Sequence, residues 1–135
     1  MATAILRRGQ AIATVQRQIG SIQAGLSFRA VLNLQKALDL PLEKIATFLG
    51  MSRATLHRRK TQGKIATAES ERLVRYQRLL EKAKNVFGDT ESAREWLTHR
   101  QPGLGNAKPI EFAKTEIGAR EVENLLGRIE YGVYS

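Results

Sequence analysis

The sequence predicts an all-α protein, and three observations lead to this prediction. Apolar side chains recur at steps of three and four residues in most segments, which is the period of an amphipathic helix. No segment shows the alternation of apolar and polar residues that is typical of a half-buried strand. Glycine or proline stands where several of these segments end or begin. The 135 residues, 42% of them hydrophobic, suffice for one domain or two small ones with a buried core.

Residues 42–61 have the spacing of two short helices joined by a tight turn, a helix-turn-helix. The first helix carries aliphatic residues on one face: Leu42, Ile45 and Leu49. Ala46 is small enough to let the second helix cross closely, and Gly50 can take the left-handed conformation that ends a helix. Ser52 is predicted to cap the second helix, which turns Leu56 inward.

The second helix presents basic and polar side chains, as expected for a helix that reads DNA. The residues predicted to contact DNA are Ser52, Arg53, Thr55, Arg58, Arg59 and Lys60. Of these, Arg53, Thr55 and Arg58 are predicted to face base edges or nearby phosphates, and the other three the backbone. Arg59 departs from the usual pattern, because most such units have an aliphatic residue seventeen positions after Leu42. The alternative is a solvated basic hairpin inside an ordinary helical bundle.

The charge distribution favours the DNA-binding interpretation. Residues 1–66 hold eleven Lys and Arg against two acids, whereas residues 67–135 hold eleven against eleven. The whole net charge of +9 therefore lies in the half that contains the helix-turn-helix. A solvated face needs no such imbalance, so the sequence indicates a polyanionic partner such as double-stranded DNA.

Several classes of function are disfavoured by composition. The chain has no cysteine and only two histidines, which leaves no thiolate or histidine-based metal site and mildly favours the cytoplasm. No apolar run approaches the roughly 20 residues that span a bilayer, and the N-terminus lacks the apolar stretch of a secretory signal. The glycines of residues 101–109 do not have the spacing of a nucleotide loop, so no cofactor is expected. No nucleophile, base and orienting group can be assembled, and we therefore expect no catalytic residues and no enzyme.

Residues 1–26 are expected to form an amphipathic helix. Its apolar residues are Ile12, Val15, Ile19, Ile22 and Leu26, which follow one another at alternating steps of three and four. This stripe can pack on the protein's own domain, or it can pair two copies, because helix-turn-helix proteins usually read DNA as dimers.

Four further helices are expected. One spans residues 27–40 and covers the back of the helix-turn-helix, and Pro41 starts the next helix. A long helix is expected to begin after Thr67 as N-cap and to end at Gly88. Asp89 is expected to cap a helix in which Trp96 belongs to the core. A turn-rich segment at 101–109 then leads to a short helix opened by Pro109.

The last helix is expected from Ala119 to Gly132, and an aromatic tail follows it. Free termini usually carry small polar residues, whereas this chain ends with Tyr131 and Tyr134 around a glycine and a valine. Such a terminus is better explained by docking, either on its own domain or in a partner's cleft.

Taken together, the segments SRATLHRRK, AESERLVRY, NVFGD, AREWL, GLGNAKP and TEIGAREVENLLGRIEYGVYS resemble the Xre/MbcA/ParS family of antitoxins over roughly residues 25–135. The resemblance implies an Xre-like helix-turn-helix bundle, here residues 27–66, followed by a small helical toxin-binding domain, here residues 67–135. It also implies a RES-domain toxin that consumes or transfers from NAD as the partner, a homodimer as the DNA-binding unit, and autoregulation of the operon's own promoter.

On this interpretation the C-terminal segment occludes the active site of the toxin. The residues expected to bind the toxin are Arg128, Glu130, Tyr131, Gly132, Val133 and Tyr134. Two other classes stay open. A stand-alone repressor would need a small-molecule pocket in the second half, where no polar cluster lies within an apolar seam. A structural scaffold would not need the basic charge to be concentrated in one half.

Overall fold

The computed structural model describes residues 2–132, and helices are the regular elements within that range. In chain order they are α1 (Ala2–Ala24), α2 (Phe28–Leu38), α3 (Leu42–Phe48), α4 (Arg53–Gln62), α5 (Thr67–Phe87), α6 (Thr90–Thr98), the 3-10 turn η1 (Pro102–Leu104), α7 (Pro109–Phe112) and α8 (Glu116–Glu130). The extended pairs between Ser27 and Lys64 and between Gln101 and Ala107 are isolated bridges. The predicted all-α fold, with its helix-turn-helix at α3 and α4, is confirmed.

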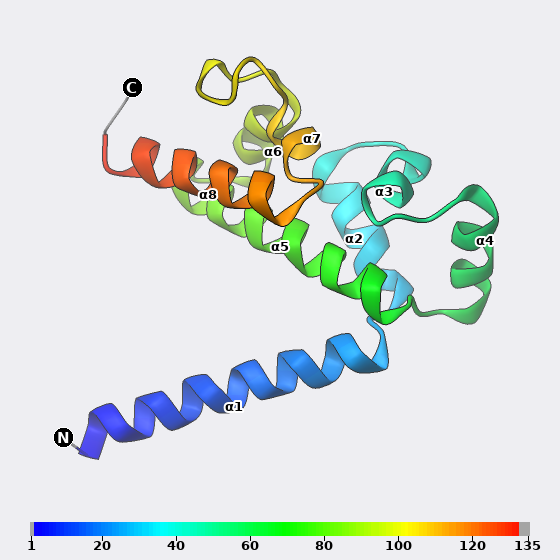
Figure 1. The fold of residues 1–135 in the computed structure, drawn as a ribbon, viewed down its shortest axis with the longest axis horizontal. Coiled ribbons are helices and arrows are strands. Elements are labelled where there is room, and N and C mark those ends of the chain that lie inside the picture. Colours follow the sequence, from blue (N-terminus) through cyan, green and yellow to red (C-terminus); the bar gives the residue numbers. More distant parts are fainter. Residues whose placement is uncertain (1, 133–135) are drawn as a thin grey trace.

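Helix α5 is the central element of the molecule (Figure 1). Helices α6 and α8 pack against it on one side of the structure, and α2 and α3 lie toward its N-terminal end. Helix α4 forms the edge farthest from the end of α8, whereas α1 packs against α5 near its own C-terminal end and then diverges from the body. The two outermost parts of the structure are therefore α1 and α4.

One hydrophobic core joins both halves of the chain. Its buried residues run from Phe28 in α2 to Leu126 in α8 as a single cluster. Helix α5 contributes fully buried side chains, including Leu73 and Leu79, and the ring of Tyr76 stacks on Phe48 of α3 with the centroids 5.3 Å apart. The core is thus continuous across residue 66, the position of the predicted domain boundary.

The starts of three helices differ from the sequence-based expectation, and the smallest difference is that α3 begins at Leu42 with Pro41 as its N-cap rather than in its first turn. The N-cap of α5 is Ala66 rather than Thr67, whose hydroxyl instead donates to the carbonyl oxygen of Gln23 at 3.0 Å. The carboxylate of Glu69, the third residue of the helix, accepts the N–H of Ala66 at 2.8 Å. This is the hydrogen bond that the third residue makes to the N-cap residue in a capping box. Helix α8 begins at Glu116, three residues before the predicted start, because the Thr115 hydroxyl caps it by accepting the Gly118 N–H.

Trp96 lies at the edge of the core rather than inside it. Its side chain is half-buried, and its ring packs at a tilt on Phe87 with the centroids 5.5 Å apart. Along residues 2–132, no helix combines the length and apolarity required to cross a bilayer.

Candidate functional site

The turn between α3 and α4 has the predicted geometry. Gly50 has a φ of 78°, and the Ser52 hydroxyl accepts the Thr55 N–H at 3.1 Å as the N-cap of α4. A contact from α5 also holds this turn, since the Arg72 guanidinium donates to the carbonyl oxygen of Leu49 at 3.0 Å. That carbonyl belongs to the last turn of α3, where helix carbonyls have no partner within the helix. Helix α5 therefore holds the end of α3, from which the turn leads into α4.

Helix α4 projects a polar face into solvent. Only Leu56 is buried in this helix. Four of the residues predicted to contact DNA are exposed: Ser52, Arg53, Arg58 and Lys60. Thr55 is half-buried, and its hydroxyl accepts a hydrogen bond from Ser52 at 3.1 Å. His57, which the sequence analysis did not assign to this face, is exposed one helical turn after Arg53. The four-residue spacing from Arg53 was the signal that could have placed it there.

Arg59 has a different position from the one expected for a backbone-contacting residue. Its guanidinium forms an ion pair with Glu69 of α5, with Nε 2.8 Å from Oε1, and its side chain is only 19% exposed. A further guanidinium N–H donates to Gln62. Arg59 therefore occupies the site of the usual aliphatic residue and ties α4 to the start of α5, and its contact with the DNA backbone stays a prediction.

Glu69 is the anionic centre of this junction. Burial would raise the pKa of its carboxyl, but hydrogen bonds from the Arg59 side chain and the Ala66 N–H hold the pKa below its usual range. The carboxylate is therefore charged at neutral pH and matches the cation beside it. A second ion pair between the two halves joins Lys44 of α3 to Glu111 of α7 at 2.7 Å. Two cations of the basic half are thus engaged by carboxylates of the other half, whereas the exposed cations of α4 face outward.

The end of α8 presents the residues predicted to bind a toxin. Val122, Leu125 and Leu126 face the core, as expected, and so fix this helix on its own domain. Past them, Glu130 is exposed, and Tyr131 is 81% exposed, so its ring does not cover the core. Gly132 has a φ of 71° and turns the chain away from the helical path. Val133 and Tyr134 lie outside the described residues.

The predicted toxin-binding residues are divided between two hollows of the surface. Arg128 and Tyr131 line a cavity of about 420 Å3, together with Lys82 of α5 and Asn124, which the sequence analysis did not select. Arg128 is half-buried, and its Nε is enclosed without a hydrogen-bond partner among residues 2–132. Glu130 instead lines a larger cavity beside α5. No cluster of His, Cys, Asp or Glu in the described range has the grouping of a metal site.

Comparison with known proteins places this arrangement in a family. A family model described as the antitoxin Xre-like helix-turn-helix domain matches residues 12–94, which is more than half of the chain. A second model, for the antitoxin Xre/MbcA/ParS C-terminal toxin-binding domain, matches residues 82–132. The chain belongs to the Xre/MbcA/ParS antitoxin family. Its similarity to these antitoxins thus covers both the helix-turn-helix and the C-terminal helices.

Two curated relatives agree with this assignment. The chain is 34% identical over 119 residues to a protein named antitoxin Xre from Yersinia enterocolitica serotype O:8 / biotype 1B, covering 87% of this chain and 80% of that protein. It is 40% identical over 75 residues to another antitoxin Xre, from Photorhabdus laumondii subsp. laumondii, covering 55% of this chain and 51% of the relative. This chain is therefore an antitoxin of a toxin–antitoxin system, with a helix-turn-helix domain. The two family models overlap at residues 82–94, which are the end of α5 and the start of α6.

Proposed function

We propose that this antitoxin neutralises a RES-domain toxin that consumes or transfers from NAD, by placing its C-terminal segment in the active-site cleft of the toxin. The observation that carries the proposal is the exposure of Tyr131, which directly follows α8. The helix is anchored by Val122 and Leu126, whereas Tyr131, at its end, is 81% exposed. An anchored helix that ends in an exposed aromatic residue supplies rigid apolar area to a partner at little entropic cost.

One charge at this end suits a site that binds an anionic cofactor. Such a site is lined by cations, and the exposed carboxylate of Glu130 would pair with them once the cofactor is displaced. Arg128 and Lys82 line the hollow beside Tyr131, and in the complex Arg128 would instead pair with a carboxylate of the toxin. Inhibition is then steric, and the antitoxin itself needs no catalytic residue, metal or cofactor.

We further propose that the antitoxin binds its own promoter as a homodimer through α4, in the cytoplasm and on the nucleoid when bound to DNA. The exposed side chains Arg53 and Arg58 are the contacts expected at base edges or nearby phosphates, with Ser52 and Lys60 on the backbone. Helix-turn-helix proteins commonly bind two half-sites as a symmetric pair, so a homodimer fits this mode of recognition.

The toxin-binding part is tested by deleting residues 131–135. The two described residues that the deletion removes, Tyr131 and Gly132, are exposed, so the melting temperature and promoter binding should be nearly unchanged. Protection of cells that express the genomically neighbouring toxin should be abolished, and intracellular NAD should fall. A truncated protein that keeps its melting temperature and still preserves NAD would overturn the proposal that the C-terminal segment blocks the active site of the toxin. Copurification of the full chain with the neighbouring gene product identifies the toxin.

The DNA-binding part is tested by measuring promoter affinity across salt concentrations for the variants Arg53→Ala and Arg58→Ala. Loss of a base contact should cost about 1–3 kcal/mol of binding free energy. Loss of a phosphate contact should instead reduce, by about one, the slope of the logarithm of the binding constant against the logarithm of the salt concentration. Both variants should still neutralise the toxin, which makes them the matched control for the tail deletion. A wild-type affinity that does not weaken as salt rises would contradict the electrostatic interpretation.

A further inference from the structure

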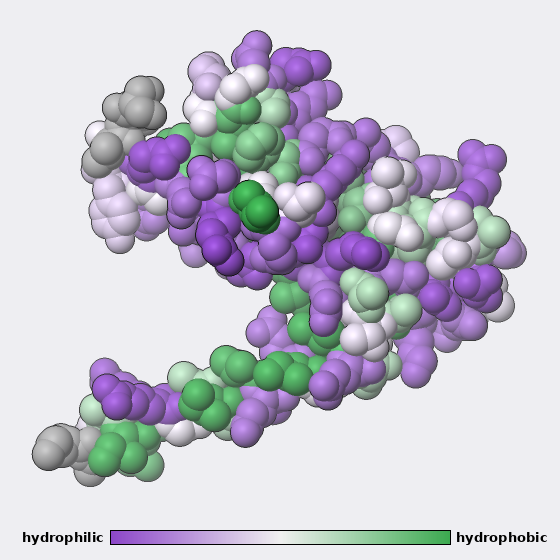
Figure 2. All heavy atoms as spheres, in the orientation of Figure 1, coloured by the Kyte–Doolittle hydropathy of each residue, from purple (hydrophilic) through white to green (hydrophobic). Residues whose placement is uncertain are grey.

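Helix α1 carries an apolar stripe that the chain itself leaves exposed. Figure 2 shows hydrophobic atoms along much of the length of this helix, outside the body of the molecule. Ile5, Ile12 and Ile19 follow one another at steps of seven, and Val15 and Ile22 lie three residues after the last two. We call these five residues the α1 seam. The spacing is that of alternating a and d positions in a coiled coil.

Contacts within residues 2–132 leave most of the α1 seam uncovered. Ile12, Val15 and Ile19 are each 48–59% exposed, whereas Ile22, nearest the body, is half-buried. Single exposed aliphatic residues are ordinary, but a continuous row of them on one helix marks an interaction surface.

The sequence of α1 is also a poor one for a helix that stands alone. Gly9 and Gly20 lie in its interior, and each lowers helix stability by about 1 kcal/mol relative to alanine. The first turn has no acid and the last turn no base, so neither end is stabilised by the helix dipole. Helices in proteins gain most of their stability from packing an apolar face, and this face needs a partner.

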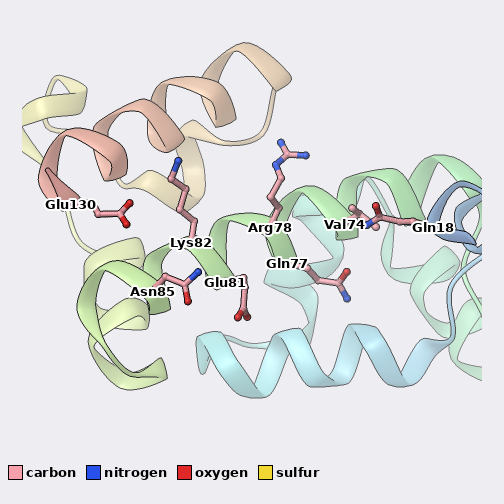
Figure 3. A pocket seen from close by; sticks show the side chains of 8 residues that line it. All are labelled: Gln18, Val74, Gln77, Arg78, Glu81, Lys82, Asn85 and Glu130. Carbon is pink, nitrogen blue, oxygen red and sulfur yellow. The ribbon is translucent and has the colours of Figure 1, made fainter. Parts of the chain in front are cut away.

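A cavity runs beside the seam. Its volume is about 760 Å3, and Gln18 of α1 lines it together with Val74, Gln77 and Glu81 of α5. Figure 3 shows the lining residues in a row along α5, with Gln18 at one end of the row and Glu130 at the other. Gln77 and Glu81 point to one side of α5, whereas Arg78 and Lys82 point toward α8 (Figure 3). The cavity therefore extends along several turns of α5 and reaches α1 at Gln18.

We propose that the α1 seam binds the α1 helix of a second copy of this chain, antiparallel, so that the second helix lies along the opening between α1 and α5. The inference rests on the proposed homodimer and is independent of toxin and DNA binding. A two-fold symmetric contact needs a surface that is complementary to itself, and the seam meets this requirement. With the helices antiparallel, Ile12 faces Val15 of the partner and Ile5 faces Ile22 of the partner, so that every a position meets a d position.

Charge decides between the antiparallel and the parallel arrangement. Arg8 occupies the remaining d position of the seam, and α1 contains arginines but no acid. A parallel pair would set Arg8 against Arg8 of the partner, which is repulsive. The antiparallel pair sets Arg8 of one copy opposite Ile19 of the other copy. Gln18 precedes Ile19 in the sequence and lines the cavity, so the arginine of one copy lies at the cavity of the other, which Glu81 also lines. Glu81 is exposed, and its ion pair with Lys84 is long, at 3.6 Å, so it is available to the incoming arginine.

The oligomeric state of the purified full-length antitoxin tests the seam. The variant Val15→Asp/Ile19→Asp should be a monomer by light scattering, because two carboxylates would be buried in the contact. The matched control is Gln10→Asp/Ser21→Asp, which adds the same charge to the opposite face of α1 and should stay dimeric. Thermal unfolding followed by Trp96 fluorescence should be similar in both variants. A Val15→Asp/Ile19→Asp protein that is still dimeric would overturn the α1 seam while leaving the proposed homodimer intact.

Charge reversal tests the pairing of Arg8 with Glu81. Each of Arg8→Glu and Glu81→Arg should weaken dimerisation by roughly 3- to 10-fold, and the double variant should restore it. Arg7→Glu is the matched control, since Arg7 lies away from the seam and its reversal should have a smaller effect. Additive losses in the double variant would overturn the pairing.

Disulfide trapping tests the orientation, because the chain has no native cysteine. A mixture of Ile5→Cys and Ile22→Cys proteins should cross-link to heterodimers faster than either protein cross-links to itself. Rapid cross-linking of Ile5→Cys to itself would overturn the antiparallel arrangement, in which the two copies of residue 5 lie about 25 Å apart along the helix axis. A monomeric wild-type protein whose α1 is instead protected only by promoter DNA or by the toxin would overturn the proposal as a whole.

Discussion

Arg59 stands where a helix-turn-helix usually has an aliphatic residue, and its ion pair with Glu69 takes over the role of that residue. Both side chains are largely shielded from water, at 19% and 9% exposure. Removing one partner of such a pair leaves a charge without compensation, which costs more than the pair itself contributes. We expect Arg59→Ala to lower the free energy of unfolding, by less than the loss of one partner of a fully buried pair because water still reaches Arg59.

Urea unfolding of Arg59→Ala, Glu69→Gln and the double variant provides the measurement. The double variant should be more stable than Arg59→Ala, since it leaves no uncompensated carboxylate. The lowered pKa of Glu69 means that its ionised form stabilises the fold above the unfolded pKa of about 4.3 and that this contribution is lost as pH falls through the folded value. Glu69→Gln should therefore flatten the loss of stability on acidification. An Arg59→Ala protein of wild-type stability would contradict the structural role.

Tyr76 carries a buried hydroxyl that has no hydrogen-bond partner within residues 2–132. Burial raises the pKa of this phenol to about 12. The folded state holds the proton more tightly than the unfolded state, whose tyrosine ionises near pH 10, so stability should fall as pH rises from about 10 toward 12. We expect Tyr76→Phe to be neutral or stabilising by up to about 1 kcal/mol at pH 7, because it removes an unpaired polar group and keeps the stacking on Phe48.

Denaturant unfolding at pH 7 and at pH 11 measures this effect. The difference in stability between Tyr76→Phe and the wild type should be larger at the higher pH, where only the wild type has this phenol to ionise. A variant that loses more than about 1 kcal/mol at pH 7 would indicate that the hydroxyl has a partner, such as an ordered water.

At the scale of the elements, the α3–α4 turn depends on a glycine for two reasons that can be separated. Gly50 has a φ of 78°, and a Cβ at this position would lie 2.6 Å from Nη1 of Arg72. Gly63, at the end of α4, has a similar φ of 82° but nothing within 4 Å of such a Cβ. Gly63→Ala should cost about 1 kcal/mol through backbone strain alone. Gly50→Ala should cost more, because the guanidinium must also leave the Leu49 carbonyl.

Thermal unfolding of the two alanine variants, together with promoter binding, distinguishes these contributions. We expect only Gly50→Ala to weaken DNA binding as well as stability, since Arg72 holds the end of α3 beside the turn that leads into α4. Equal losses of stability in the two variants would mean that Arg72 moves aside freely and does not position the turn.

The sequence predicted elements with strong local signals better than it predicted contacts between them. The helix-turn-helix, the Ser52 cap and the glycine-ended long helix follow from periodicity and from turn chemistry that lies within a few residues. The start of α5 was placed one residue too late because the sequence does not show what the Thr67 hydroxyl binds. In the structure this hydroxyl donates to Gln23, and Glu69 accepts the N–H of the N-cap residue Ala66. The Arg59 contact could not be foreseen, because an arginine on a basic helix resembles a DNA contact until its acid is located in space.

At the scale of the whole molecule, helix α5 belongs to the helix-turn-helix and to the toxin-binding helices alike. Its arginines bind carbonyl groups on both sides, Leu49 through Arg72 and Lys114 through Arg75, and its apolar residues belong to the one core cluster. A shared helix of this kind predicts that the two halves unfold together, even though the family models treat them as separate domains. The sequence could not reveal this coupling, since helical periodicity shows which face is apolar but not which neighbours cover it.

We therefore expect a single cooperative unfolding transition. Its midpoint should fall by a similar amount when a core residue of either half is truncated. Leu38 in α2 and Leu126 in α8 are both fully buried or nearly so, and truncating either to alanine should cost about 2–5 kcal/mol. Fluorescence of Trp96, the only tryptophan, reports on α6, whereas far-UV circular dichroism reports on all helices. In each variant the two signals should give coincident midpoints, because the core is continuous across residue 66. A biphasic transition in Leu126→Ala, with a helical phase at the wild-type midpoint, would instead mean that residues 27–66 fold on their own as a separate domain.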